Sequence, residues 1–148
     1  MRIPILSANG DFPDLQNIHP SGIVALAGEL NTETLLKAYS SGIFPWYSDS
    51  DPCIIWHCPP ERMVLQPGKH VLSKSMQKVF RNSEFELRID SVFAQIISAC
   101  ATSYRVDQDG TWITTEMQNA YIALHKAGYA HSFEAWQNGM LVGGLYGV

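Results

Sequence analysis

The dipeptide Asn138-Gly139 constrains the fold most strongly, because it separates two apolar runs, Ala130 to Trp136 and Met140 to Val148. Asparagine and glycine both tolerate positive φ, which a tight two-residue hairpin turn requires. The sequence therefore predicts a pair of antiparallel strands over these two runs. The second run is apolar to its last residue, and an apolar strand without a polar tail seldom closes a domain. We therefore expect a truncated chain, whose polypeptide continues past Val148.

The pattern before this hairpin changes period several times. Residues 85–90 alternate apolar and charged side chains, which predicts a strand with one solvated face. Helices are expected over 92–101 and 115–126, with Gly128 as the stop of the second. From residue 84 the predicted order is strand, helix, helix, strand, strand, without an internal repeat. This order is typical of the α+β class and not of an alternating parallel sheet.

The first sixty residues have a different organisation. A helix is expected between Asn31, whose side chain can accept from the free amides of a first turn, and Gly42. The segment 42–47 is predicted as a loop, since a proline cannot continue the helix. A short strand within 48–61 is expected to end at the rigid Pro59-Pro60. We place the boundary there, with a small N-terminal α/β domain over 1–62 and a second domain over 63–148.

A helix over 71–81 is predicted to carry the positive charge of this chain. Lys74, Lys78 and Arg81 share one helical face, and residues 69–88 hold five basic side chains against two acidic ones, while the formal net charge is -4. A local positive island on an acidic protein can bind a few phosphates without indiscriminate binding. A merely solvated helix face is the alternative interpretation.

Composition excludes several classes of protein. With 46% hydrophobic and 16% charged residues, most of the chain is expected to be globular. No apolar window approaches the ~18 residues of a membrane span, and the first residues do not resemble an export signal. Three sparse cysteines fit a reducing compartment. We therefore expect a cytoplasmic protein that neither crosses nor enters a membrane.

Few residues have a spacing that indicates chemistry by itself. Cys53, His57 and Cys58 lack the second ligand pair of a structural zinc site, so no metal is predicted. Asp107 and Asp109 are interpreted as turn residues, and His125 and His131 as ordinary polar residues. Trp46 and Trp112 lie beside turns, where an indole can stack on a nucleobase or line an apolar pocket. Core filling is the alternative for both.

Several longer stretches resemble the leucyl/phenylalanyl-tRNA-protein transferase family. They are Gly22 to Leu30 (GIVALAGEL), Leu35 to Tyr39 (LLKAY), Gly42 to Tyr47 (GIFPWY), Gly110 to Thr114 (GTWIT), Gly128 to Ser132 (GYAHS) and Leu141 to Val148 (LVGGLYGV). The resemblance runs from about residue 20 to the end. It implies an aminoacyltransferase that moves Leu or Phe, and also Met, from aminoacyl-tRNA to the N-terminal Arg or Lys of acceptor proteins. The new peptide bond marks these proteins for degradation in the bacterial N-degron (N-end rule) pathway.

The resemblance also implies a fold and a set of site residues. It predicts a GNAT-like (N-acyltransferase) second domain, of which this chain holds the first part only, and neither cofactor nor metal. Trp46 and Trp112 match positions that contact the 3′ adenosine and aminoacyl end, with Tyr39 and Tyr121 in support. Leu145 matches a position that lines the amino-acid pocket, where the family can have Met. Lys74, Lys78 and Arg81 match part of a cluster that holds the tRNA acceptor stem.

The catalytic residues implied by the resemblance, a carboxylate and a glutamine, fall beyond Val148. The catalytic residues of this chain are therefore unknown, and the chain alone is expected to be inactive. Two alternatives remain open at this point. A CoA-dependent GNAT N-acyltransferase would share the fold, and a non-catalytic tRNA-end-binding module would use the same binding residues.

Overall fold

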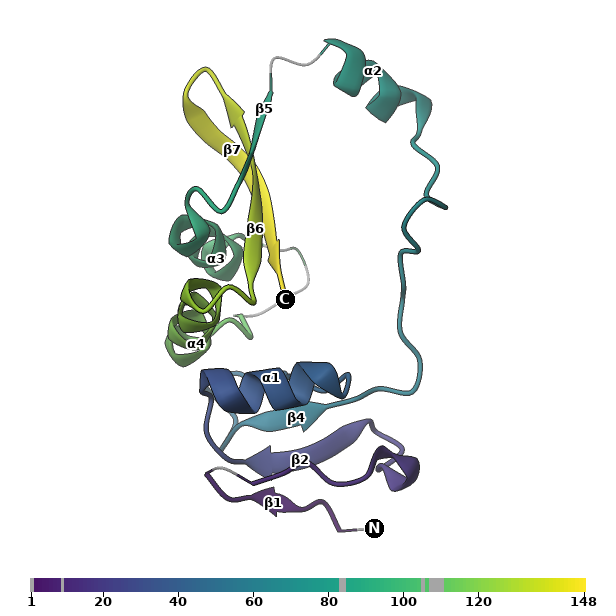
Figure 1. Ribbon diagram of the computed structural model, residues 1–148, viewed down its shortest axis with the longest axis vertical. Helices are drawn as coiled ribbons and strands as arrows, with labels where there is room; N and C mark the ends of the chain where they lie inside the picture. Colours follow the sequence, from purple (N-terminus) through teal and green to yellow (C-terminus); the bar gives the residue numbers. More distant parts are fainter. Residues whose placement is uncertain (1, 9, 83–84, 105, 107–110) are drawn as a thin grey trace.

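The computed structural model describes residues 2–8, 10–82, 85–104, 106 and 111–148 (Figure 1). Its first sheet has the strand order β1-β2-β4-β3. The strands are β1 (Ile5–Leu6), β2 (Ile23–Ala27), β3 (Phe44–Pro45) and β4 (Ile55–His57), and a single 3-10 turn, η1 (Leu15–Asn17), precedes β2. β1 runs parallel to β2, whereas β4 is antiparallel to both of its neighbours.

The helix α1 (Thr32–Ser40) covers this sheet and begins as predicted (Figure 1). The Asn31 side chain accepts a 2.9 Å hydrogen bond from the Thr34 amide, and Gly42 follows the helix with φ of 73°. The prediction of a loop over 42–47 is wrong in part, because Phe44 and Pro45 pair with β4 as a two-residue strand. Proline tolerates this place because β3 is the last strand of the sheet.

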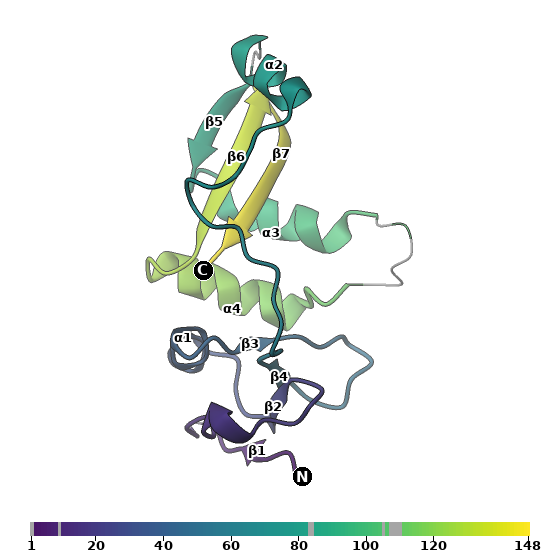
Figure 2. The same cartoon turned by 90° about the vertical axis from the view of Figure 1, so that its right-hand side faces the viewer.

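The second sheet contains the predicted hairpin. Its order is β5-β6-β7, all antiparallel, with β5 (Glu86–Ile89), β6 (His131–Gln137) and β7 (Met140–Gly147). Asn138 and Gly139 connect β6 to β7 with φ of 51° and 74°, which confirms the hairpin turn. The helices α3 (Phe93–Thr102) and α4 (Thr115–Lys126) lie on one side of this sheet (Figure 2). The element order from β5 onward and the α+β class are therefore confirmed.

The apolar face of β5 does not pack as its alternating pattern suggested. Leu87 and Ile89 are 71% and 61% exposed, and Phe133 on the neighbouring strand is 51% exposed. Ile89, Phe133 and Leu145 lie in register across the three strands, on the face that the helices do not cover. The period of two predicts the strand correctly, but its apolar side chains are exposed where the pattern predicts a solvated charged face. Within the described residues, the apolar face is open.

The basic helix α2 (Lys74–Asn82) begins three residues later than predicted. The Ser73 hydroxyl accepts from the Met76 amide at 3.2 Å, so Ser73 acts as the N-cap, and Val71 and Leu72 precede the helix. Every residue from 60 to 82 is exposed, and α2 stands apart from α1 and α4 in both views (Figures 1 and 2). The predicted polar loop over 103–110 lies largely outside the described residues, as do Asp107 and Asp109.

One hydrophobic core joins the two sheets. Leu35 on α1 and Trp56 on β4 belong to the same buried cluster as Ile97 on α3 and Met117 and Leu124 on α4, and all five are fully enclosed. α1 packs directly against α4. The two halves of the chain are therefore held together by side-chain packing, and not only through the exposed connection over 60–82.

Candidate functional site

An open aromatic pocket lies where β3 meets the start of the α4 region. Its walls are Phe44, Pro45, Trp46 and Trp112, and its volume is about 520 Å³. Pairing of β3 with β4 fixes Phe44 and Pro45, and the Trp46 amide donates to the Ile55 carbonyl at 2.9 Å. The Trp46 indole is 55% exposed. A rigid backbone thus presents an accessible indole face, which is what stacking on a planar ligand requires.

Arg62 brings positive charge to the edge of this aromatic pocket. Its guanidinium lies 5.3 Å from the centre of the Phe44 ring and donates to the Gly42 carbonyl. Arg62 could not be predicted from the sequence, since one arginine after Pro59-Pro60 has no distinctive spacing. The antiparallel pairing of β3 with β4 brings the residues that follow β4 back beside Phe44.

A second, apolar pocket shares a wall with the first. It has a volume of about 370 Å³ and is lined by Tyr39, Cys100, Trp112, Ile113, Tyr121 and residues 144–148. Trp112 therefore lies between the two pockets. The apolar pocket gathers side chains from α1, α3, α4 and the end of β7, four elements that are distant in sequence.

Two tyrosines form the polar part of the apolar pocket. The hydroxyls of Tyr39 and Tyr121 share a short hydrogen bond, and the two rings meet edge to face with centroids 6.3 Å apart. Burial raises the pKa of Tyr39, and burial followed by the neighbouring Tyr39 raises the pKa of Tyr121. Both hydroxyls are therefore neutral at physiological pH, so they can orient a ligand by hydrogen bonding but are poor proton acceptors.

A second hydrogen bond connects the same two halves of the chain nearby. The Tyr47 hydroxyl donates to the Glu116 carboxylate at 2.8 Å, at the first turn of α4. Burial, and then this hydrogen bond, raise the pKa of Tyr47 to about 12. Hydrogen bonds of Tyr39 and Tyr47 thus connect α1 and the segment that follows β3 to α4, beside the two pockets.

The structure brings together most of the sequence-predicted site residues, but not all of them. Tyr39, Trp112, Tyr121 and Leu145 line one pocket, and Trp46 joins them through the neighbouring pocket. Lys74, Lys78 and Arg81 all lie on α2, away from both pockets (Figure 1).

Sequence analysis did not single out Phe44, Pro45 or Cys100 as lining residues. Phe44 and Pro45 lie in the aromatic GIFPWY segment, next to the predicted Trp46. For Cys100, which the sequence placed in the core of α3, the helical pattern offered no signal, because half-buried Cys100 also contacts the core.

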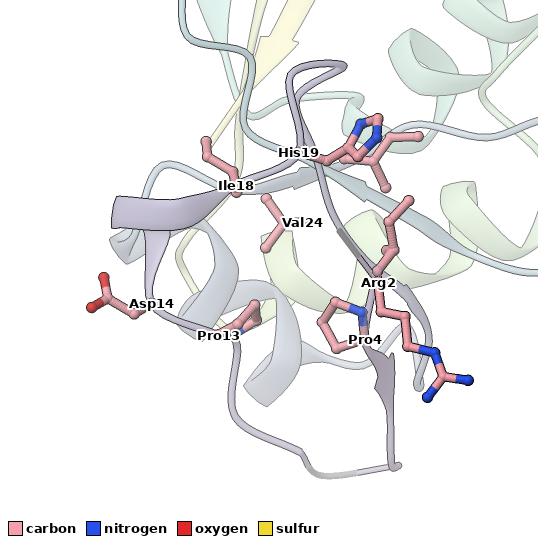
Figure 3. Close-up of a pocket in the computed structure, with 9 residues that line it drawn as sticks. Arg2, Pro4, Pro13, Asp14, Ile18, His19 and Val24 are labelled. Carbon is pink, nitrogen blue, oxygen red and sulfur yellow. The ribbon is translucent and has the colours of Figure 1, made fainter.

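Another cavity, of about 330 Å³, lies between β2 and the residues around Pro4 and Pro13 (Figure 3). Its walls are mainly Pro4, Pro13, Ile18 and Val24, while the charged ends of Arg2 and Asp14 lie on opposite sides of the view (Figure 3). A ligand site has a few polar groups that converge on the ligand. The two charged groups of this cavity, Arg2 and Asp14, do not converge, so the two joined pockets are the better candidate.

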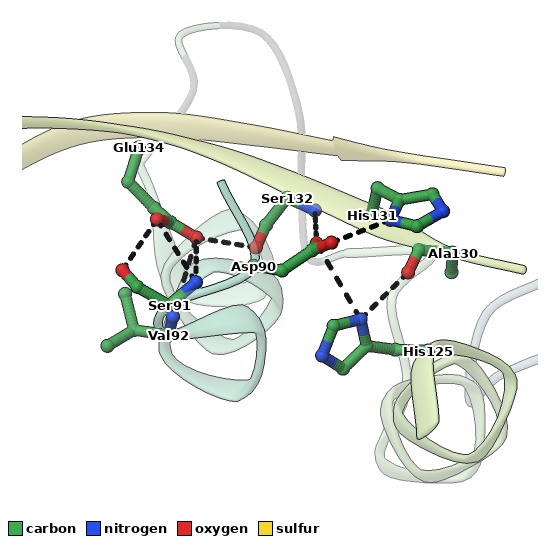
Figure 4. Close-up of polar contacts among 8 residues, drawn as sticks. All are labelled: Asp90, Ser91, Val92, His125, Ala130, His131, Ser132 and Glu134. Atoms are coloured by element: carbon green, nitrogen blue, oxygen red, sulfur yellow. Dashed lines mark hydrogen bonds and ion pairs between the residues drawn. The ribbon is translucent and has the colours of Figure 1, made fainter. Parts of the chain in front are cut away.

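A polar network supports the base of the second sheet (Figure 4). Asp90 accepts from His131 at 2.7 Å and from the Ser132 amide at 2.8 Å, with His125 3.8 Å away. Hydrogen bonding from His131, and then from Ser132, lowers the pKa of Asp90. The two histidines, which the sequence placed on ordinary polar faces, therefore anchor the junction of β5, α4 and β6.

Two further features bear on the class of protein. Among the described residues, no group of three or more His, Cys, Asp or Glu side chains is arranged to hold a metal ion. In the same part of the chain, no helix has both the length and the apolar character of a membrane span. The fold and the joined pockets define an α+β protein with an aromatic and an apolar pocket side by side.

Comparison with known proteins identifies the family. The model of the leucyl/phenylalanyl-tRNA protein transferase family matches residues 64–148, and the model of its N-terminal domain matches residues 28–60. The first match alone covers more than half of the chain. The chain therefore belongs to the leucyl/phenylalanyl-tRNA protein transferase family.

Curated relatives with the name leucyl/phenylalanyl-tRNA-protein transferase support this assignment. The Chromobacterium violaceum protein is 49% identical over 148 residues, which are 99% of this chain and 63% of the relative. The Saccharophagus degradans protein is 52% identical over 129 residues, 87% of this chain and 52% of the relative. The Myxococcus xanthus protein is 50% identical over 137 residues, 93% of this chain and 58% of the relative. The chain thus spans only part of the length of these relatives.

Proposed function

We propose that this chain is the aminoacyl-tRNA-binding part of an aminoacyltransferase. The whole enzyme moves Leu or Phe, and also Met, from aminoacyl-tRNA to the N-terminal Arg or Lys of acceptor proteins, which are thereby marked for degradation. The reaction takes place in the cytoplasm and uses no cofactor. Membership of the family and the names of the relatives support this proposal.

The observation that carries the proposal is the shared wall at Trp112. The 3′ end of an aminoacyl-tRNA has two parts, a planar adenine and an apolar amino-acid side chain, joined through the ribose. The chain has an open aromatic pocket and an apolar pocket, and Trp112 lines both. We assign adenine stacking to Trp46 and Trp112, and the amino-acid side chain to the apolar pocket at Leu145. Tyr39 and Tyr121 then orient the ester or the ribose.

The basic face of α2 completes this assignment. Lys74, Lys78 and Arg81 lie apart from the pockets, as is required of residues that contact the acceptor stem and not its terminal nucleotide. Lys74, Lys78 and Arg81 are all exposed. Phosphate contacts of this kind supply affinity without sequence recognition.

The mechanism follows from the chemistry of the ester. The aminoacyl ester is already activated, so the enzyme must hold the acceptor α-amine against the ester carbonyl, remove a proton from the amine and stabilise the oxyanion. The amide bond forms as the ester C–O bond breaks, and the ribose hydroxyl of the tRNA leaves with a proton. The residues described above bind and orient. The neutral tyrosines do not serve as the base, and we place the proton acceptor in the part of the family that this chain does not span. We also propose that the chain divides into two domains, over 1–62 and 63–148, and that the second domain is GNAT-like.

A transfer assay with a chimera tests this function. Labelled Leu-tRNA and an Arg-initiated peptide are incubated with this chain, or with this chain extended by the remaining part of the Chromobacterium violaceum relative. We expect both proteins to bind Leu-tRNA but only the extended one to form the peptide bond. Transfer by the short chain would refute our assignment of the base. Binding without transfer by either protein would favour the tRNA-end-binding module, and acetyl-CoA binding would favour the N-acyltransferase.

A further inference from the structure

Arg62 brings a positive charge without a counter-charge to one wall of the aromatic pocket. Its guanidinium lies 5.3 Å from the centre of the Phe44 ring, and no carboxylate in the described part of the chain forms an ion pair with it. His57 lies opposite Phe44 on β4, but burial lowers the pKa of its imidazole, which is therefore neutral at physiological pH. The permanent charge at the Phe44 wall is thus that of Arg62.

The side chain of Arg62 is exposed and yet held in one orientation. Its Nε donates to the Pro59 carbonyl at a long 3.5 Å, and Nη2 donates both to the Gly42 carbonyl and to Cys58 Sγ, the latter at 3.3 Å. A guanidinium has five N–H donors, and these contacts use three of them. The other two, on Nη1, have no partner among the described residues. An arginine held in this way can bind an anion with little further loss of side-chain freedom.

We propose that Nη1 of Arg62 binds the 5′ phosphate of the terminal adenosine, the phosphate that joins this nucleotide to the rest of the tRNA. The assignment rests on the function proposed above, which places the adenine in the aromatic pocket and the amino acid in the apolar pocket. Contacts between a guanidinium and a phosphate are charge-assisted and are among the stronger hydrogen bonds of proteins.

The chemistry of the ribose directs the phosphate to this side. The base and the 5′ carbon lie on one face of the sugar ring, and the 3′ oxygen that carries the amino acid lies on the other. Trp112 lines both pockets, whereas Phe44 lines the aromatic pocket alone. When the ester passes Trp112 towards the apolar pocket, the phosphate stays with the adenine, where Arg62 lies against Phe44.

This contact has a different task from that of the basic helix. Lys74, Lys78 and Arg81 lie on α2, apart from both pockets, and are assigned to the acceptor stem. A contact with the last phosphate instead fixes how far the 3′ end enters the pockets. Arg62 is therefore a residue that positions the ester, in addition to the affinity that it supplies.

Isothermal titration calorimetry with two small compounds tests the proposal. They are 3′-leucylamino-3′-deoxyadenosine, in which a stable amide replaces the ester, and the same compound with a 5′ phosphate. Neither reaches α2, so the helix does not contribute. For the 148-residue chain we expect the phosphate to increase the affinity roughly tenfold, as a hydrogen bond to a charged group does.

Two variants locate this gain. In Arg62→Gln the gain should disappear, while the affinity for the phosphate-free compound stays within a factor of about two of the parent. The matched control is Arg2→Gln, because Arg2 is also exposed but lines only the cavity beside β2. Arg2→Gln should keep the whole gain. Circular dichroism of both variants must match that of the parent.

Each other result contradicts a particular step. Equal affinities for the two compounds in the parent, or a gain that persists in Arg62→Gln, overturn the phosphate contact and leave the proposed function intact. Equal weakening of both compounds in Arg62→Gln also overturns it, because Arg62 would then only support the backbone at Gly42. Loss of the gain in Arg2→Gln overturns it as well, since the overall charge would be responsible. A parent that binds neither compound overturns the assignment of the two pockets, and the phosphate contact with it.

Discussion

Trp112 is the residue on which the two pockets depend, because it forms a wall of each. Removal of one stacking side chain costs about 1–3 kcal/mol per base. We therefore expect Trp112→Ala to raise the dissociation constant for Phe-tRNA by roughly tenfold to a hundredfold. Trp46→Ala opens only the aromatic pocket and should weaken binding less. Fluorescence anisotropy with labelled tRNA measures both constants.

Tyr129→Ala is the control for these substitutions. Tyr129 is 51% exposed and lines neither pocket, so its loss should leave the affinity within a factor of about two of the parent. If Trp112→Ala and Tyr129→Ala bind equally well, the two-pocket assignment is wrong.

Tyr47 gives the chain a characteristic response to alkaline pH. Its pKa is raised from 10.0 to about 12 in the folded protein, first by burial and then by the hydrogen bond to Glu116. The folded state therefore holds this proton above pH 10, where the unfolded chain releases it. The stabilisation is fully present below pH 10 and decreases as the pH rises towards about 12.

Urea unfolding at a series of pH values measures this effect. In Tyr47→Phe the group cannot ionise, so the free energy of unfolding should decrease less steeply above pH 10 than in the parent. Equal slopes in the two proteins would show that Tyr47 does not titrate as its surroundings require.

The residue pattern alone pointed to Trp46 and Trp112, whereas Tyr39, Tyr121 and Leu145 were expected only from the family resemblance. Trp46 and Trp112 stand beside turns, where large apolar side chains need an explanation. Cys100 fits the helical period of α3 like any core residue, although it lines the apolar pocket. The period of a helix shows which face is buried, but not whether another side chain or a cavity lies opposite.

Among the elements, α3 has the least usual start. Its N-cap residue, Val92, makes no side-chain cap, and the Glu134 carboxylate on β6 binds the backbone just before the helix instead (Figure 4). Glu134 accepts from the Ser91 and Val92 amides at 3.2 and 3.4 Å and from the Ser91 hydroxyl at 2.6 Å. Burial opposes ionisation of this carboxyl, but hydrogen bonds from Ser132, Ser91 and Val92 outweigh it and lower its pKa.

We expect Glu134→Gln to reduce the free energy of unfolding by about 1–3 kcal/mol near neutral pH, since it weakens buried charge-assisted hydrogen bonds. The lowered pKa means that this stabilisation is present above the pKa of the unfolded chain and is lost as the pH falls through the folded value. The difference between parent and variant in urea unfolding should therefore shrink in acid. Glu86→Gln, which removes an exposed partner of Arg88, should reduce the free energy of unfolding much less than Glu134→Gln does. A cost as large as that of Glu134→Gln would contradict this account.

The charge of α2 should appear in the salt dependence of tRNA binding. Each phosphate contact adds about 0.7–0.9 to the slope of log affinity against log salt. When Lys74, Lys78 and Arg81 are all changed to Gln, we expect the magnitude of this slope to decrease by about 2 to 3. Lys37→Gln and Lys126→Gln should leave the slope unchanged. An unaltered slope in the triple variant would show that α2 contacts no phosphate.

Local chemistry explains why some elements were predictable and others were not. The β6–β7 hairpin depends on two residues with positive φ, and the start of α1 on one capping side chain, so neighbours in sequence suffice. The open face of β5 depends on what lies over the sheet. Alternation predicts that a strand has two faces, but cannot show which face α3 and α4 cover.

At the scale of the whole molecule, the common core predicts cooperative unfolding. Leu35 on α1 is fully buried among residues of both sheets. Leu35→Ala should therefore lower the free energy of unfolding by about 2–5 kcal/mol. Hydrogen exchange should report the same loss in β2 and in α4. Loss confined to β2 would mean that the two halves unfold separately.

The exposed stretch over 60–82 connects the two halves of the chain covalently but does not pack them together. It carries the covalent continuity between the sheets, yet none of its side chains is buried. Cohesion comes instead from α1 against α4 and from the Tyr39–Tyr121 and Tyr47–Glu116 contacts. A single cut in this stretch would thus create two new ends without uncovering any core. The same freedom permits insertions, deletions or relocated termini in this stretch, while the two pockets keep their shape.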